Sequence, residues 1–378
     1  MPLLDDLLSD CVRLDASDVH LVPGRAPFFR VHGVLEAQAE RVPLTPADLD
    51  VIVETLTRNF DRDSMTRNGA IDGAVTGPGG VRFRFNVFRS QGEMAAAIRR
   101  LEDRFRSLSD LGLPESLYSL CDLPDGLVLV CGPTGSGKST TLATMLDRIN
   151  RTRKCHVITI EDPVEYLHES QLSLVNQRQL GRDTPGFNEA LVASLRQDPD
   201  VILVGEIRDL NTIRTAVTAA ETGHLVFTTV HAGDCVGSLE RVVSVFPADE
   251  QIGVRRQLSL VLRAVIAQHL LVADGPAAIR PSSPGQTVRR SRIVTSEVMT
   301  STPAVANLIA SAKTNQIYSA METGTAQGMQ TLEQDLARLV VIGMITEATA
   351  TMMSRSPGVL KDRIAMLRKS PPKAGVAR

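Results

Sequence analysis

The sequence is poor in cysteine and in aromatic residues. Its 378 residues include five cysteines, no tryptophan, three tyrosines and ten phenylalanines. An odd number of cysteines without any Cys-x-x-Cys pair argues against a disulfide framework and against a thiolate zinc site. Scarce aromatic side chains also leave few surfaces on which the bases of single-stranded nucleic acid could stack. We therefore expect a protein of the reducing cytoplasm whose cores are mainly aliphatic.

Long apolar runs and an excess of one charge are missing as well. No stretch approaches the roughly 18 uninterrupted apolar residues of a membrane-spanning helix. The opening stretch MPLLDDLLSD carries acids where a secretory signal would carry bases, so no export is expected. With 41 basic and 43 acidic residues, the chain has no general attraction to nucleic acid or to anionic lipid. We expect neither a transmembrane segment nor a nucleic-acid partner.

The first 106 residues combine helical and strand-like patterns. Leucines at helical spacing come first, followed by extended segments such as VHLVPG and PFFRVHGVL. In VRFRFNVF the apolar residues alternate with Arg82, Arg84 and Asn86, so one face of this strand is expected to be core and the other basic. Residues 1–106 are thus predicted to form a small α+β domain. A linker with turn-forming glycine and proline is expected at 107–125.

Strands and helices alternate through residues 126–273. The apolar segments GLVLV, HVITI, DVILV and LVFTTV are separated by helical patterns, which is typical of a parallel sheet covered by helices. Their continuous apolar character supports this prediction, because a strand buried on both faces loses its polar alternation. Further on, residues 250–272 are expected to form one long amphipathic helix.

The last third of the chain is expected to be mainly helical. A stretch rich in proline, serine and arginine at 274–292 predicts a flexible surface loop. Helical patterns at 304–312 and 332–341 follow, in a C-terminal helical part assigned to residues 293–362. Residues 363–378 are expected to form a disordered tail. The predicted fold class is α/β, with a smaller N-terminal α+β domain and this C-terminal part.

The strongest chemical signal is GPTGSGKST, which directly follows an apolar strand and opens a helix. It satisfies G-x-x-x-x-G-K-[ST], a loop whose backbone N–H groups and following helix N-terminus surround polyphosphate. Lys138 is expected to reach the β- and γ-phosphates of ATP, and Ser139 to ligate Mg²⁺. The predicted nucleotide-binding residues are Gly132, Pro133, Thr134, Gly135, Ser136, Gly137, Lys138, Ser139 and Thr140.

Two acidic clusters follow later strands. Glu161, Asp162 and Glu165 come just after HVITI, and Glu206 and Asp209 come just after DVILV. In an open parallel sheet the carboxyl ends of the strands face the ligand crevice. We therefore expect these acids to converge on the nucleotide, where hydrolysis also needs an oriented water and neutralisation of the γ-phosphate charge.

Two histidines flank the strand LVFTTV. His224 precedes it and His231 follows it, a separation that prevents both rings from binding one metal ion, so a zinc site is not expected. His231 lies at the carboxyl end, where it could contact the γ-phosphate. For His224 a structural role is an equally good interpretation.

The four stretches around these residues resemble, in order and spacing, the motifs of the secretion ATPases of type II and type IV systems. The resemblance is greatest to the PilT-like retraction ATPases of type IV pili. GPTGSGKST is similar to the Walker A motif of that family, ITIEDPVEY to its Asp box, DPDVILVGEIRD to its Walker B motif and TAAETGHLVFTTVH to its His box. Similarity extends from SDVHLVPG to KTNQIYSAMETGTAQGMQTLEQDLARLV and so covers most of the chain.

This resemblance implies a PAS-like N-terminal domain, a RecA-like P-loop ATPase domain and a homohexamer that binds ATP between subunits. It implies that Glu165 polarises the attacking water, that Glu206 holds the hydration shell of Mg²⁺, and that His231 senses the γ-phosphate. The roles of Glu165 and Glu206 could be exchanged, since both are placed to act as a base or as a metal-shell acid. Arg84 and Arg99 are the candidate arginine fingers.

The function implied by the resemblance is Mg-dependent ATP hydrolysis that powers pilus retraction and twitching motility. The protein would act at the cytoplasmic face of the inner membrane, on a membrane-embedded platform protein of the pilus. Assembly and type II secretion ATPases carry a tetracysteine zinc insertion that this sequence lacks, which favours the retraction class. The chain departs from the retraction pattern at residues 304–310, which read AVANLIA for AIRNLIR, and in the His box, which ends HAGD for HTNS.

Three alternatives stay open at this point. The protein could be the motor of another type II or type IV secretion system, or a PilT-like accessory subunit that works with a paralogue. From a different class, it could be a nucleotide-binding regulator or scaffold of the pilus machine that does not hydrolyse ATP. ATP turnover that is lost on substitution of Lys138 or Glu206 would exclude this last alternative.

Overall fold

The chain forms two compact units. The first comprises Met1–Arg104, Ile158–Ser170 and Val175–Ala193, and the second comprises Phe105–Val157, Gln171–Leu174 and Ser194–Arg378. The computed structural model describes residues 2–31, 33–58, 60, 65, 69–101, 105–278 and 292–369. Among the described residues, no helix combines the length and the hydropathy needed to cross a membrane.

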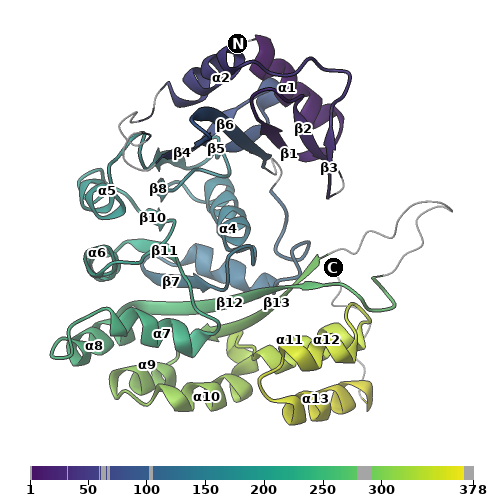
Figure 1. Ribbon diagram of the computed structural model, residues 1–378. Helices are drawn as coiled ribbons and strands as arrows, with labels where there is room; N and C mark the ends of the chain where they lie inside the picture. The colour runs from purple at the N-terminus through teal and green to yellow at the C-terminus, as the bar shows by residue number, and fades with distance from the viewer. Residues whose placement is uncertain are drawn as a thin grey trace. The chain divides into compact units, whose positions relative to one another are not determined.

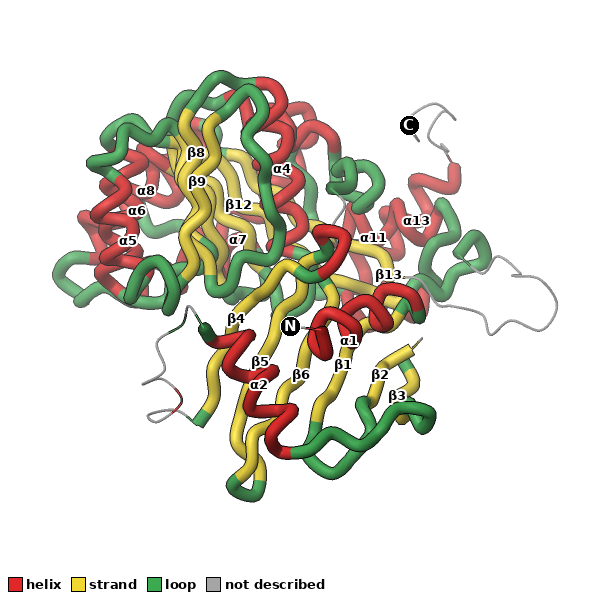
Figure 2. Tube along the Cα trace, turned by 90° about the horizontal axis from the view of Figure 1, so that it is seen from above, coloured by secondary structure: helices red, strands yellow, loops and turns green. Residues whose placement is uncertain are grey.

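The first unit is built on a six-stranded sheet in the order β3-β2-β1-β6-β5-β4, in which neighbouring strands are antiparallel. Helices α1 and α2 pack on this sheet (Figure 2). The elements are α1 (Pro2–Arg13), β1 (Ala16–Leu21), β2 (Phe28–Val31), β3 (Val34–Ala37), α2 (Pro46–Thr57), β4 (Ala70–Thr76), a 3₁₀ helix (Pro78–Gly80), β5 (Arg82–Ser90) and β6 (Glu93–Arg100).

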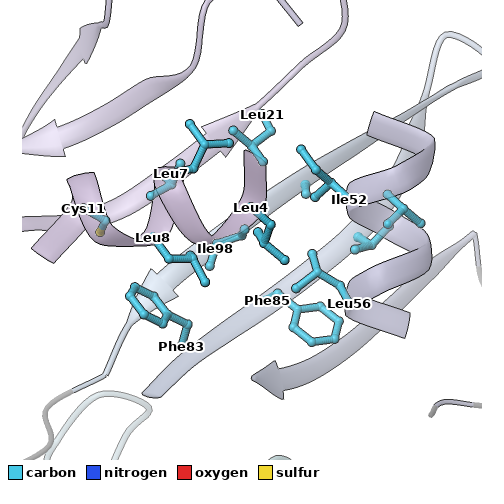
Figure 3. Packing of buried hydrophobic residues seen from close by; sticks show 14 of the residues in the cluster. Leu4, Leu7, Leu8, Cys11, Leu21, Ile52, Leu56, Phe83, Phe85 and Ile98 are labelled. Atoms are coloured by element: carbon cyan, nitrogen blue, oxygen red, sulfur yellow. The ribbon is translucent and has the colours of Figure 1, made fainter. Parts of the chain in front are cut away.

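The core of the first unit follows from two sequence periods. Leu4, Leu7 and Leu8 repeat at helical spacing and share the buried face of α1. Phe83 and Phe85 repeat every second residue along β5 and point into the same core, as the alternation predicted. Figure 3 shows these side chains meeting between the helices and the sheet.

A seven-stranded sheet, in the order β13-β12-β7-β11-β10-β8-β9, accounts for the alternating strand and helix pattern. Strands β12, β7, β11 and β10 are mutually parallel, and β13 is antiparallel to β12. The elements are a 3₁₀ helix (Glu115–Asp122), β7 (Gly126–Cys131), α4 (Lys138–Thr152), β8 (His156–Glu161), β9 (Leu174–Gln179), α5 (Phe187–Ser194), β10 (Val201–Val204), α6 (Leu210–Glu221), β11 (Leu225–Val230), α7 (Cys235–Ser244), α8 (Gln251–Val261), β12 (Leu262–Val272) and β13 (Arg292–Thr300).

The middle of this sheet is buried on both faces. Every residue of β7, β10 and β11 is buried, which explains why these strands show no polar alternation in the sequence. Polar side chains near these strands are therefore found in the loops at the strand ends, and the candidate site residues lie there. The sequence pattern predicts each of these three strands and the helices between them.

The prediction of one long helix over residues 250–272 is wrong in its second half. Helix α8 ends at Val261, and the apolar run LRAVIAQHLLV forms β12 instead. β12 pairs in parallel with β7 on one edge and antiparallel with β13 on the other, so its backbone N–H and C=O groups are satisfied on both edges. A short apolar run fits a buried strand as well as a buried helix, and periodicity alone does not separate them.

Helices follow β13 to the end of the described chain (Figure 1). They are α9 (Pro303–Ala310), a 3₁₀ helix (Thr314–Gln316), α10 (Ile317–Thr323), a second 3₁₀ helix (Gly324–Gln327), α11 (Leu332–Val341), α12 (Glu347–Met353) and α13 (Pro357–Lys369). Residues 363–369, assigned from the sequence to a disordered tail, thus belong to α13, where Ile364 packs in the core that includes α11. Residues 279–291 of the expected loop and 370–378 of the expected tail lie outside the described residues.

Candidate functional site

The loop between β7 and α4 has the backbone conformation that a phosphate loop requires. Gly132, Gly135 and Gly137 have φ angles of 143°, 78° and 94°, a region that residues with a Cβ rarely adopt. Gly137 is the N-cap of α4, and no side chain caps this helix end. A helix N-terminus of this kind attracts anions through its backbone N–H groups and its dipole.

The side chains of this loop suit a polyphosphate ligand. Lys138 Nζ donates to the carbonyl oxygens of Gly132 and Pro133, at 3.0 Å each, so its ammonium group lies over the loop. Ser136 Oγ is buried and has no hydrogen-bond partner among the described residues, an arrangement that costs roughly 1–3 kcal/mol unless a ligand supplies one. Ser139 is exposed at the start of α4. Together these groups offer an ammonium, two hydroxyls and a helix N-terminus.

Gly132 is closely packed against β12. A Cβ at this position would overlap the carbonyl oxygen of Gln268 and lie 2.6 Å from Ser136 Oγ. Gln268 is itself buried, and its Nε2 donates to Thr141 Oγ1 of α4 at 2.9 Å. β12 therefore supports both the beginning of the loop and the first turns of the helix that follows it.

This packing predicts that Gly132→Ala damages the loop. The added methyl group forces the loop away from β12, so we expect unfolding free energy to fall by roughly 1–3 kcal/mol and affinity for a fluorescent ATP analogue to drop. Gly253→Ala in α8 is the matched control, because a Cβ there meets nothing within 4 Å. Chemical denaturation and nucleotide titration of both variants measure the difference, and equal behaviour of the two would contradict the prediction.

Glu206 and His231 meet at the carboxyl ends of β10 and β11. His231 Nε2 lies 3.4 Å from Glu206 Oε2, and Arg208 Nη2 lies 2.7 Å from the same carboxylate oxygen. Thr229 Oγ1 donates to the carbonyl oxygen of Gly205 at 2.6 Å and so joins the two strand ends. The Glu206 carboxylate thus lies between the side chains of Arg208 and His231, at the edge formed by the carboxyl ends of the parallel strands.

The phosphate loop begins at the same edge. β11 is the parallel neighbour of β7, and Val230 is paired with Cys131. His231 and Gly132 are the residues that follow this pair, so the His box and the phosphate loop leave adjacent strands at the same level. Sheet register thereby brings together three motifs that are far apart in the sequence.

Two carboxylates of the Asp box have different surroundings in the first unit. Glu161 Oε1 accepts hydrogen bonds from Thr159 Oγ1 at 2.6 Å and from Gln177 Nε2 at 3.1 Å, and burial raises the pKa of Glu161 to about 6. Glu165 is partly exposed, and Arg84 Nη1 lies 3.8 Å from its Oε1. Glu161 is therefore anchored by neutral donors, whereas Glu165 is more available to a ligand or a water.

Two residues that the sequence grouped with the site have local structural partners. Asp209 is the N-cap of α6 and accepts hydrogen bonds from the backbone N–H and the hydroxyl of Thr212. Although burial opposes it, these bonds hold the pKa of Asp209 below its usual range. His224 Nδ1 lies 2.9 Å from the carbonyl oxygen of Ala219, at the amino end of β11. Helix capping and turn formation account for these two side chains.

The two candidate arginine fingers are both paired within the first unit. Arg84 lies beside Glu165, and Arg99 Nε donates to Asp18 Oδ1 at 2.7 Å. The phosphate loop, Glu206 and His231 belong to the second unit. A role for the arginines toward a neighbouring subunit stays a prediction.

Sequence reasoning missed two residues next to the site. Arg208 forms an ion pair with Glu206, and Gln268 lies beneath Gly132. Arg208 follows the Walker B strand closely, but no spacing rule marks it as a partner of Glu206. Gln268 gave a usable signal, because a polar residue within an otherwise apolar run must find hydrogen bonds when it is buried.

Comparison with known proteins shows the family to which this chain belongs. The family model described as type II/IV secretion system protein matches residues 1–351. The chain belongs to this family. This match confirms the family predicted from the sequence. The predicted α/β fold class with a RecA-like core is confirmed by the likeness to solved structures of the family.

Type IV pilus ATPases are among the relatives of this chain. The type IV pilus retraction ATPase PilT of Pseudomonas aeruginosa is 42% identical over 354 residues, which are 94% of this chain and 98% of that protein. The type IV pilus ATPase PilU of the same species is 36% identical over 357 residues, which are 94% and 90% of the two chains. A crystal structure of the pilus retraction motor PilT with bound ADP matches with a TM-score of 0.84 at 40% identity, covering 95% of this chain and 98% of that one.

Proposed function

We propose that this protein hydrolyses ATP to power the retraction of type IV pili. The observation that carries the proposal is the phosphate loop beside the Glu206–His231 pair, at the open edge of a RecA-like sheet. It occurs in a chain that is 42% identical, over nearly its whole length, to a pilus retraction ATPase.

The phosphate loop is the binding site for ATP in this proposal. Lys138 exchanges its carbonyl acceptors on the loop for phosphate oxygens, and the N-terminus of α4 adds its backbone N–H groups. Ser139 and, through water, Glu206 would hold Mg²⁺, which neutralises phosphate charge when it is bound. The fixed ammonium and N–H groups then stabilise the charge that develops on the transferred phosphoryl group.

Attack by water needs a carboxylate that orients it. Glu206 faces Arg208 and His231 at the end of β10, which suits a residue of the metal hydration shell. Glu165 faces Arg84 at 3.8 Å and is partly exposed, so we assign it the polarisation of the attacking water. His231 contacts Glu206 and would respond to loss of the γ-phosphate.

The working assembly in this proposal is a homohexameric ring at the cytoplasmic face of the inner membrane. Arg84 and Arg99 would act there on the nucleotide of a neighbouring subunit, and domain closure would link hydrolysis to movement of a membrane-embedded pilus platform. The support is the likeness, over nearly the whole chain, to a solved pilus retraction motor.

A PilT-like accessory subunit is the second candidate. Ala306 and Ala310 stand where the retraction pattern has arginines, and both lie partly exposed on α9, while Val305 and Ile309 form its buried face. The change thus removes two surface cations without disturbing the core. The 36% identity to PilU is consistent with an accessory subunit that works with a paralogue.

Complementation separates these roles. In a strain of the source organism that lacks only this gene, we expect piliated cells without twitching motility, restored by the wild-type chain and not by an equally expressed Lys138→Ala variant. Motility that persists unless a PilT-like paralogue is also deleted would favour the accessory role. Normal pilus retraction in the absence of both proteins would contradict the proposed function.

A further inference from the structure

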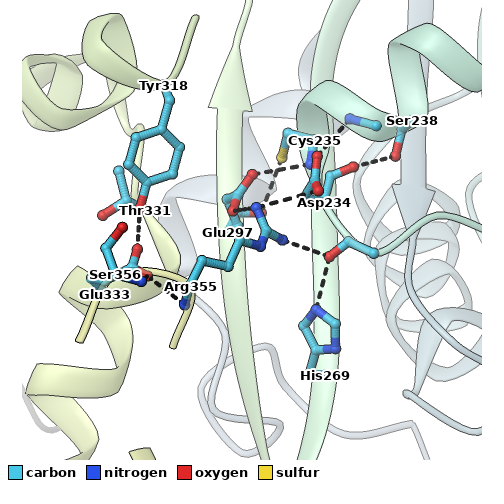
Figure 4. Close-up of polar contacts among 12 residues, drawn as sticks. Asp234, Cys235, Ser238, His269, Glu297, Tyr318, Thr331, Glu333, Arg355 and Ser356 are labelled. Atoms are coloured by element: carbon cyan, nitrogen blue, oxygen red, sulfur yellow. Dashed lines mark hydrogen bonds and ion pairs between the residues drawn. The ribbon is translucent and has the colours of Figure 1, made fainter. Parts of the chain in front are cut away.

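The four residues that follow β11 are tied to the C-terminal helices by one arginine. We call residues 231–234, which connect β11 to α7, the His231 loop. Arg355, in the turn between α12 and α13, donates from Nη2 to the carbonyl oxygen of Gly233 at 2.8 Å. Its Nη1 lies 3.3 Å from Asp234 Oδ2 (Figure 4). The guanidinium therefore contacts two adjacent residues of the loop, Gly233 and Asp234.

A buried carboxylate of β13, that of Glu297, contacts both Arg355 and the residue that follows the loop. Arg355 Nη1 lies 3.4 Å from Glu297 Oε2, and Glu297 Oε1 accepts from the backbone N–H of Cys235 at 3.0 Å. Glu297 is 1% exposed, and burial raises its pKa while the charge of Arg355 opposes that rise. Arg355 is thus the cation that compensates a buried acid behind the His231 loop.

The turn that carries Arg355 is itself fixed. Glu333 of α11 is fully buried, and its Oε1 accepts from the backbone N–H groups of Arg355 at 3.1 Å and Ser356 at 3.2 Å. The same oxygen accepts from Ser354 Oγ at 3.1 Å, and the hydroxyl of Tyr318 donates to the other oxygen. Four hydrogen bonds to the Glu333 carboxylate thereby fix the turn from which the guanidinium extends.

The His231 loop is also in contact with β12 of the seven-stranded sheet. His269 of β12 lies with Nε2 3.0 Å from the carbonyl oxygen of Gly233, which therefore has contacts to both β12 and the C-terminal turn. Asp234 also caps α7 by accepting from the N–H of Gly237 at 2.5 Å. The two loop residues that Arg355 contacts, Gly233 and Asp234, belong to the HAGD sequence, the point at which this chain departs from the HTNS pattern.

We propose that Arg355 is a positioning residue for ATP hydrolysis: it holds the His231 loop so that His231 stays against Glu206, and it thereby couples helices α11–α13 to the nucleotide site. The proposal rests on the proposed ATPase function. Gly233 is two residues from His231, so movement of its carbonyl group is transmitted through two peptide units to the 3.4 Å contact with Glu206.

Kinetics of the full-length protein test the positioning role. We expect Arg355→Ala to lower kcat roughly 10- to 100-fold while the KM for ATP changes less than about twofold, because the phosphate loop is untouched. Arg355→Lys, which keeps the charge but not the planar fork, should recover part of the loss. The matched control is Arg368→Ala, which removes an exposed ion pair with Glu347 in the same helical region and should leave kcat unchanged. An unchanged kcat in Arg355→Ala would overturn the proposal.

The route through His231 has its own test. If Arg355 acts by placing His231, then Arg355→Ala should cause little further loss of kcat in a His231→Ala background. Equal fold losses in the two backgrounds would show a general structural role and overturn the proposal. The Arg355→Ala/Glu297→Gln double variant removes the uncompensated buried charge, so a folding defect from that charge does not obscure the result.

Hydrogen exchange separates this inference from the proposed function. Without nucleotide, amides in residues 231–237 should exchange about tenfold faster in Arg355→Ala and in the double variant than in the wild type or in Arg368→Ala. This measurement needs no ATPase activity. A wild-type protein without turnover would refute the proposed function, whereas unchanged exchange in residues 231–237 would refute the restraint by Arg355.

Discussion

Lys138→Ala should reduce kcat/KM for ATP by roughly 10²- to 10³-fold. Lys138 Nζ lies 3.0 Å from two carbonyl oxygens of the phosphate loop, so its charge is fixed where the β- and γ-phosphates would bind. Its removal leaves the developing charge of the transferred phosphoryl group without this ammonium. Steady-state phosphate release, together with titration of a fluorescent ATP analogue, measures the loss of turnover and of affinity.

A second lysine provides the control for this prediction. Lys361→Ala removes an exposed ammonium from α13 and should leave both turnover and nucleotide affinity within about twofold of the wild type. Turnover of Lys138→Ala within tenfold of the wild type would contradict the assignment of the phosphate loop.

Glu206→Gln should lower kcat about 100-fold and raise the Mg²⁺ concentration needed for half-maximal rate. Glutamine keeps the size of the side chain but removes the charge that Arg208 and His231 face. Nucleotide affinity should change little, because the phosphate loop keeps its lysine and its backbone geometry. Initial rates over a Mg²⁺ series, at saturating ATP, give the two values.

Glu165→Gln is the matched variant for separating the two acidic roles. If Glu165 polarises the attacking water, its substitution lowers kcat without shifting the Mg²⁺ requirement, since its ion-pair partner is Arg84 in the first unit. The reverse pattern, with a Mg²⁺ shift in Glu165→Gln and none in Glu206→Gln, would exchange the two roles. Wild-type kcat in Glu206→Gln would exclude it from the reaction altogether.

The conformation of the phosphate loop could be predicted because its information is local. The spacing of Gly132, Gly137 and Lys138, after an apolar strand and before a helix, predicts the backbone conformation that the structure shows, whereas the ATP ligand stays a prediction. A related argument predicts that the later acids lie at one edge, since parallel strands place their carboxyl ends together. Glu206 and His231 do meet there, at 3.4 Å.

Other features depend on contacts that periodicity does not encode. The apolar run of β12 satisfies both the helical and the strand period, and only its pairing with β7 and β13 decides between them. Arg355 reaches Gly233 across 122 positions of the chain, through a turn that Glu333 holds in place. No spacing rule joins such distant segments, so this contact could be found only in the folded structure.

The cysteines show what composition can and cannot predict. All five are free thiols, in agreement with the absence of a disulfide framework in the sequence analysis. Burial raises the pKa of Cys11 to about 11 and that of Cys121 to about 12, so these thiols behave as small apolar side chains. The number of cysteines does not predict that Cys11 and Cys121 lie in cores that are built from distant segments of the chain.

Steady-state ATP hydrolysis by the purified full-length protein with Mg²⁺, with particle mass determined by light scattering in the same buffer, tests the central claim most directly. The account predicts Mg²⁺-dependent release of phosphate by a particle of six subunits. An inert monomer that still binds ATP would contradict the motor function and would instead indicate a nucleotide-binding regulator.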